Sequence, residues 1–299
     1  MYQRLHGSFL VAGLLAVSGP HALGQEVETD APLILPDLVV TGELQERTVQ
    51  DSQTSVVILP GAELDQRDDF DLYDIIERTP NVVGSGGEKG FSIRGIDQRG
   101  PASGGTGLLI NTQIDGASLP TVFSAIFGPY STWDLEQVEI LRGPQSTQQG
   151  RNALAGAVVI RSADPTYDFE FKGRGELGNR DTIGGALAVN VPLIDDTAAV
   201  RFSFERAQTD GFIDNPVRDT NEYDAREQTT LRAKARLDPT EDFSAILSLS
   251  YAENFGGEDF IEASLFPGER INLSDVEGQE GSDHLIGNLR MTYDIAEDL

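Results

Sequence analysis

The sequence has no cysteine, three histidines, and fewer than half as many basic residues (22) as acidic ones (49). Without cysteine there is no disulfide, no thiolate nucleophile and no Cys-based zinc site. His6 and His21 lie in a segment that we expect to be removed, so a multi-histidine metal site is excluded from the mature chain. A Ser-His-Asp triad would depend on His284 alone. We therefore expect no enzyme, no cofactor and no metal site.

Positive charge and long apolar runs are also scarce. The net charge of −27 argues against nucleic-acid binding, which requires a basic face. The apolar run Phe9–Val17 is shorter than the ~20 residues that a membrane-spanning helix needs. It follows Arg4 and precedes the small-residue pattern Ala22-Leu23-Gly24, so residues 1–24 are predicted to be a secretory signal peptide. A buried N-terminal helix is the alternative.

Residues 25–47 are interpreted as a flexible acidic tail that carries one strand-forming segment. The β-formers Leu38, Val39 and Val40 stand alone between Pro36 and Gly42. Such a segment can add itself to the sheet edge of another protein. It could equally be the first strand of the domain that follows, and the residues alone do not decide between the two.

Residues 48–165 read as a small α+β domain. A helix is predicted over 71–78, with Asp71 as its N-cap, because apolar residues recur there at helical spacing. Strands are expected at 55–59, 91–95, 108–114, 136–142 and 157–160, and loops at 84–90, 97–107 and 117–132. The last loop is expected to expose Phe123, Phe127 and Tyr130. The glycine-rich loops lack the spacing of a phosphate-binding loop.

After Pro165 the pattern changes to long strands with one apolar and one polar face. Six segments show this alternation: 169–177, 186–193, 200–205, 231–237, 243–251 and 285–295. Their connections run short or mid-length (178–182), short (194–197), long (207–226), short (238–242) and long (253–283). Short periplasmic turns and long extracellular loops are typical of outer-membrane β-barrels. A soluble β-sandwich is the alternative, but it would not require this alternation.

Four stretches resemble the TonB-dependent outer-membrane receptors: PDLVVTG at 36–42, IRGID at 93–97, IDG at 114–116, and VEILRGPQSTQQGRNALAGAVVIRS at 138–162. The resemblance implies an energy-coupling (TonB) box, an α+β plug domain at 48–165, and the first strands of a transmembrane barrel from 166 to 299. Plugged barrels belong to the 22-stranded class, so six strands leave the barrel incomplete, and we expect the chain to be an N-terminal fragment.

The resemblance also implies partners and sites. The receptor would lie in the outer membrane of a Gram-negative bacterium, in contact with its lipid, and take up a scarce solute, most often a ferric siderophore. The box would bind TonB, which works with ExbB–ExbD, through Asp37, Leu38, Val39, Val40 and Thr41. The plug loops would present to the solute Gln98, Arg99, Phe123, Phe127 and Tyr130. Arg94 and Arg142 would form ion pairs between plug and barrel, although a lone arginine at such a strand end is usually solvated.

Other functions remain as alternatives at this point. The receptor could take up a non-iron solute such as cobalamin or a carbohydrate. A passive porin has no need of a plug or a coupling strand, and a surface-binding β-protein fits the strand lengths less well. Too few residues separate the cleavage site from the box to form a further signalling domain, so none is expected.

Overall fold

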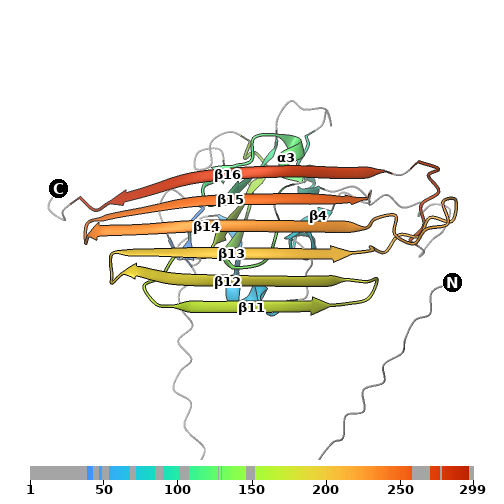
Figure 1. Ribbon diagram of the computed structural model, residues 1–299. Coiled ribbons are helices and arrows are strands. Elements are labelled where there is room, and N and C mark those ends of the chain that lie inside the picture. The colour runs from blue at the N-terminus through green and yellow to red at the C-terminus, as the bar shows by residue number, and fades with distance from the viewer. Residues whose placement is uncertain are drawn as a thin grey trace, which may run out of the picture. The chain divides into compact units, whose positions relative to one another are not determined.

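The computed structural model describes residues 39–42, 47–48, 54–67, 72–84, 90–100, 108–126, 128, 130–145, 152–257, 270–276 and 278–295. They form an N-terminal domain, which extends to Ser162, and a six-stranded sheet after it, here called the wall sheet (Figure 1). The predicted signal peptide and most of the predicted tail lie outside the described residues and stay predictions.

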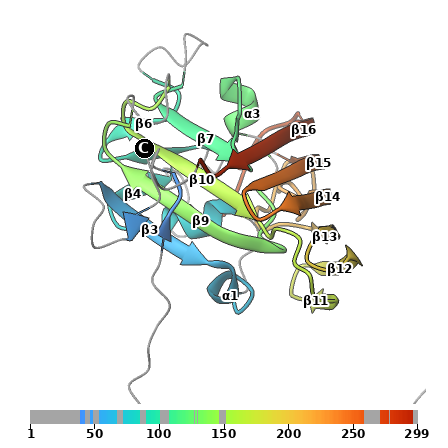
Figure 2. The same cartoon turned by 90° about the vertical axis from the view of Figure 1, so that its left-hand side faces the viewer.

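The N-terminal domain is built on a five-stranded sheet (Figure 2). In spatial order its strands are β3 (Ser55–Pro60), β9 (Leu135–Arg142), β10 (Gly156–Ser162), β7 (Ile110–Ile114) and β8 (Ala117–Ser118). Strands β10 and β7 are parallel, and the other neighbours are antiparallel.

Smaller elements complete this domain. The strands β4 (Val82–Gly84), β5 (Phe91–Ile93) and β6 (Ile96–Asp97) form a second sheet, and β1 (Val39–Val40) pairs with β2 (Arg47–Thr48). The helices are α1 (Gly61–Leu64), α2 (Leu72–Glu77) and α3 (Val122–Ile126). Helix α2 confirms the helix predicted there, and Asp71, its predicted cap, lies outside the described residues. No helix of the described part is long and apolar enough to cross a membrane.

The two faces of the five-stranded sheet are covered differently. Val138 and Ile140 of β9 belong to the main hydrophobic core, together with residues of α2 and of the smaller sheet. Leu141 of β9 points to the opposite face, where it forms a second cluster with Val40 and Val159. Because strand side chains alternate between faces, β9 contributes to both clusters.

The wall sheet is an antiparallel meander in which each strand pairs with the next in sequence. Its strands are β11 (Glu170–Leu177), β12 (Ile183–Ile194), β13 (Ala198–Thr209), β14 (Arg226–Thr240), β15 (Phe243–Gly257) and β16 (Gln279–Tyr293). The six predicted strands are confirmed, and most extend beyond their predicted limits. The connections 195–197 and 241–242 are short, whereas 210–225 and 258–278 are long, as predicted. The first connection, 178–182, is short although it lies at the same end of the sheet as the two long ones.

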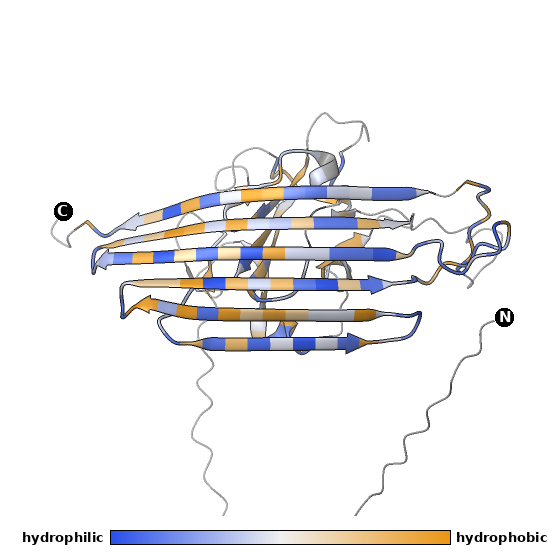
Figure 3. Ribbon diagram, viewed as in Figure 1, coloured by the Kyte–Doolittle hydropathy of each residue, from blue (hydrophilic) through white to orange (hydrophobic). Residues whose placement is uncertain are grey.

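Hydrophobic and hydrophilic residues alternate along these strands (Figure 3). On β13, Phe202 and Phe204 are 47% and 37% exposed, whereas Arg201, Ser203 and Glu205 are buried on the opposite face. That polar face carries the side chains that bond to the N-terminal domain. The apolar face is left exposed, as expected of a sheet whose outer side faces lipid.

The link between the two parts is held by Asn190 of β12, whose side chain is fully buried. Its Oδ1 accepts a hydrogen bond from the backbone nitrogen of Thr166 (3.1 Å). Its Nδ2 donates to the carbonyl oxygens of Thr166 (2.8 Å) and Asp168 (2.6 Å). The chain that leaves β10 is thereby fixed to the wall before β11 begins.

One prediction about the loops is wrong. The stretch 117–132 was expected to be a loop that exposes its aromatic residues, but it contains α3, and Tyr130 is only 3% exposed. The phenol of Tyr130 donates to the carbonyl oxygen of Ala125, and its ring packs edge-on against Tyr73. No local pattern indicates the ring contact, because Tyr73 lies far from Tyr130 along the chain.

Candidate functional site

Residues 39–42 lie on the N-terminal domain as a short extended segment, here called the docked segment. Its two strand residues form β1 and pair only with β2 among the described strands. The Val40 side chain is fully buried and belongs to the cluster of Leu141, Ala157 and Val159. The segment therefore covers one face of the five-stranded sheet without joining that sheet as a strand.

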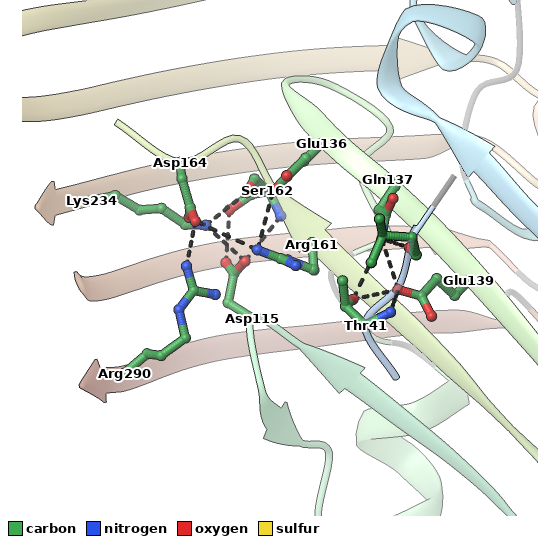
Figure 4. A network of polar contacts seen from close by, with 11 residues as sticks. Thr41, Asp115, Glu136, Gln137, Glu139, Arg161, Ser162, Asp164, Lys234 and Arg290 are labelled. Carbon is green, nitrogen blue, oxygen red and sulfur yellow. Dashed lines mark hydrogen bonds and ion pairs between the residues drawn. The ribbon is translucent and has the colours of Figure 1, made fainter. Parts of the chain in front are cut away.

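The carboxylate of Glu139 on β9 accepts hydrogen bonds from the docked segment (Figure 4). Its Oε1 accepts hydrogen bonds from the backbone nitrogen of Thr41 (2.8 Å) and from the Thr41 hydroxyl, and its Oε2 accepts one from the nitrogen of Gly42 (2.9 Å). Gln137 Nε2 donates to the same carboxylate (2.8 Å) and to the carbonyl oxygen of Val39 (3.2 Å). Glu139 has no exposed surface.

A cluster of charges joins the N-terminal domain to the wall sheet (Figure 4). Lys234 of β14 donates to Asp115 (2.9 Å), to Asp164 (2.8 Å) and to the carbonyl oxygen of Ser162 (2.7 Å). Arg290 of β16 also pairs with Asp164. Burial by itself would raise the pKa of the Asp164 carboxyl, but Lys234 and Arg290 outweigh it and hold that pKa below its usual value. Asp164 is therefore charged at neutral pH and links two wall strands to the domain.

A second contact with the wall lies at residues 131–134. Arg201 of β13 donates to both oxygens of Asp134 (2.6 and 2.9 Å) and to Glu170 (2.8 Å). Arg232 of β14 donates to the carbonyl oxygen of Trp133 (2.6 Å), and the Trp133 indole donates to the carbonyl oxygen of Leu187 (3.0 Å). These bonds fix the entrance to β9 against three consecutive wall strands, β12 to β14.

A cavity lies between this domain and the wall-strand ends that adjoin the long connection 258–278. Its lining includes Tyr73, Tyr130, Gln228, Asn254 and Glu280. Its volume of about 40 Å³ is far below the roughly 300–1,000 Å³ of a typical ligand pocket, so the described residues do not by themselves form a solute site. No group of three or more His, Cys, Asp or Glu side chains is placed to hold a metal ion among the residues described.

The predicted solute-facing residues differ in exposure: two of them are buried and one is partly exposed. Gln98 has no exposed surface and donates to the carbonyl oxygen of Ala125 (3.0 Å), so the prediction that it faces a solute is wrong for this conformation. Tyr130 is buried as well, although it is among the residues that line the cavity. Arg99 is partly exposed and pairs with Asp97 (3.1 Å). Phe127 and the side chain of Phe123 lie outside the described residues.

Arg94 and Arg142 were predicted to join plug and barrel. Arg142 instead donates to the carbonyl oxygen of Pro80 (2.8 Å), within the N-terminal domain, and Arg94 is exposed with a positive φ of 52°. Neither pairs with a wall-sheet carboxylate in the part of the chain that the structure describes. In the observed ion pairs the wall sheet supplies the cations, Arg201 and Lys234, and the N-terminal domain supplies the carboxylates. The ion pairs predicted for Arg94 and Arg142 stay predictions.

The sequence reasoning missed the residues that make the contacts. Arg201, Arg232 and Lys234 were visible as polar members of alternating strands, and their inward face could have marked them as partners of the plug. Glu139 alternates within β9 in the same way, but its partners Thr41 and Gly42 are almost a hundred positions away in the sequence. Of the predicted box, Val39, Val40 and Thr41 are described, whereas Asp37 and Leu38 are not.

Comparison with known proteins identifies the N-terminal domain. Residues 48–157 match the family described as TonB-dependent Receptor Plug Domain. The chain is 27% identical over 253 residues to the vitamin B12 transporter BtuB of Vibrio vulnificus, covering 82% of this chain and 39% of that protein. It is 25% identical to the ferrioxamine B receptor of Salmonella typhimurium, covering 68% of this chain and 29% of that protein. The chain thus spans well under half the length of these relatives.

Solved structures show the same fold. FpvA of Pseudomonas aeruginosa, in complex with a heterologous pyoverdine and iron, superposes with a TM-score of 0.66 at 15% identity, over 87% of this chain and 34% of that one. The ferric-catecholate import receptor Fiu of Escherichia coli gives 0.64 at 19% identity, over 84% and 38%. The N-terminal domain therefore matches the plug domain of TonB-dependent receptors, and the six antiparallel strands after it form an open sheet with the fold of the matched receptor structures.

Proposed function

We propose that the receptor containing these residues takes up a ferric siderophore or another iron complex across the outer membrane of a Gram-negative bacterium. Energy would come from TonB, with ExbB–ExbD, through residues 37–41. The docked segment carries this proposal: a strand-forming stretch just before the plug is held on the plug by one carboxylate and a small apolar cluster. A segment held in this way can leave and add itself to the sheet of another protein.

The plug–wall contacts support the same function. Asp134, Asp115 and Asp164 of the plug region are bound by three cations of the wall, so the plug stays in place while the segment beside it is free to exchange partners. A passive porin would not need either feature. We also propose the boundaries 1–24 for the signal peptide, 25–47 for the tail, 48–165 for the plug and 166 onward for the barrel. N-terminal sequencing of the mature receptor tests the first of them.

The proposed solute class rests on the relatives. Ferrioxamine B and catecholate siderophore receptors are among the matched proteins. Cobalamin is the second candidate, because the vitamin B12 transporter BtuB aligns with 82% of the chain. Arg99, Phe123 and Phe127 remain our proposed plug contacts for the solute.

Replacing Val39 by Pro in the intact receptor tests the energy coupling, with Val39→Leu as the control. Proline removes a backbone donor that strand addition uses. We expect uptake of radiolabelled iron complex or cobalamin by whole cells to fall at least about tenfold, with solute binding unchanged. Uptake at the control rate by the Val39→Pro receptor refutes coupling through this segment. The label that is taken up decides between the two solute classes.

A further inference from the structure

Glu139 is a buried carboxylate that, among the described residues, accepts hydrogen bonds only from neutral donors. Its partners are the backbone nitrogens of Thr41 and Gly42, the Thr41 hydroxyl and the Gln137 amide. Within the described part of the chain it forms no ion pair, and it has no exposed surface. An ionised carboxylate in this position depends on those donors, because a buried charge without partners is costly. All but one of them belong to the docked segment.

The docked segment also fits its site closely at Gly42. A Cβ atom added there would lie 2.9 Å from Leu141 Cδ1 and 3.1 Å from both Glu139 Oε2 and Val159 Cγ2. These distances are shorter than ordinary van der Waals contacts, so a side chain at this position would displace the segment or its neighbours. Glycine at position 42 is therefore required for the close approach that brings its backbone nitrogen to the carboxylate.

Docking on the plug and pairing with another strand use the same groups. The backbone nitrogens of Thr41 and Gly42 are bound to Glu139, the carbonyl oxygen of Val39 is bound to Gln137, and β1 is paired with β2. Strand addition relies on free main-chain donors and acceptors along an edge. A partner strand can therefore use these groups only after the segment has left Glu139.

We propose that Glu139 is the latch that keeps the coupling segment on the plug and withholds its backbone from the energy-transducing partner. Glu139 is a positioning residue: it acts through the segment and touches neither solute nor partner. Release breaks the hydrogen bonds that the segment donates to a carboxylate, which opposes undocking and returns the segment to the plug when the partner leaves. The identity of the partner rests on the proposed function, whereas the docking by Glu139 does not.

The test measures undocking directly, without solute or partner. Because the chain has no cysteine, Val40→Cys supplies a single thiol within these residues, at a side chain that is fully buried when docked. Its alkylation rate by a maleimide in the purified intact receptor reports how often the segment leaves. We expect Glu139→Gln to raise this rate at least about tenfold, because hydrogen bonds to a charged acceptor are lost and the new amide group opposes the backbone donors.

Glu136→Gln on the same strand is the matched control. Glu136 is 46% exposed and pairs with Arg161 (3.4 Å), away from the docked segment, so the rate should stay within about twofold. A thiol at Ala125, fully buried in the plug core, should remain unreactive in every variant if the plug is folded. Equal rates for Glu139→Gln and Glu136→Gln overturn the proposal.

Gly42→Ala provides an independent route to the same state, because it leaves the carboxylate intact and removes the close fit. It should also raise the alkylation of the thiol at position 40. If Glu139→Gln exposes both thiols, the plug has unfolded and Gly42→Ala decides: continued protection of the thiol at position 40 in that variant refutes the latch. If the alkylation rates change as expected but the unsubstituted receptor takes up neither solute, the proposed function is wrong and the role of Glu139 stands.

Discussion

Substituting Arg201 by Met is expected to loosen the plug from the barrel wall, because it leaves the buried Asp134 carboxylate without a partner. Arg201 donates a hydrogen bond to each oxygen of that carboxylate, at 2.6 and 2.9 Å. The side chains of Arg201 and Asp134 are only 4% and 3% exposed. Water therefore cannot readily replace the lost donors, and methionine fills the space without supplying a charge.

The magnitude follows from the burial. Removing one partner of a buried ion pair costs about 3–5 kcal/mol. At about 1.4 kcal/mol for each factor of ten, separation of the plug from the wall should become roughly a hundredfold to a few thousandfold more frequent. Asp134→Asn should cost less, because Arg201 retains its bond to Glu170 (2.8 Å).

The assay uses a thiol at Ala188 of β12, which is 1% exposed and packs against Trp133 in the interface. Its alkylation rate in the intact receptor reports separation of the plug from the wall at this point. Arg206→Met is the matched control on the same strand, since its ion pair with Glu227 (2.8 Å) is about half exposed on both sides. Exposed pairs contribute little to stability. If both substitutions change the rate equally, the reasoning from burial is wrong.

Two further predictions concern the plug. Gly156→Ala should destabilise the plug by about 1–3 kcal/mol or more, because the new Cβ would lie 2.3 Å from the carbonyl oxygen of Leu141. Gly175→Ala on β11 is the control and should be neutral, because its Cβ would meet nothing within 4 Å. The yield of trypsin-resistant plug measures both effects. Asp164 has a lowered pKa, so its stabilising effect is complete above its usual value near 3.8 and is lost as the pH falls through the lowered pKa. Amide exchange in β10 should therefore differ between Asp164→Asn and wild type at neutral pH but converge in strong acid.

Much of the fold could be read from local patterns. The period-2 alternation predicted all six wall strands, and the apolar spacing over 72–76 predicted α2, because both periods are properties of the backbone itself. The predicted site was less accurate. Gln98 and Tyr130 are buried through contacts with Ala125, and Arg142 bonds to Pro80, partners that no local pattern indicates.

The sequence by itself determined the order of the parts, the strand-forming nature of residues 38–40, and the two-faced strands whose apolar side remains exposed. Only the tertiary structure decided which polar and charged groups meet. Glu139 reaches Thr41, and Lys234 reaches Asp115, across about a hundred residues of intervening chain. Such pairs depend on register and on the packing of one sheet against another, and burial then gives them their strength.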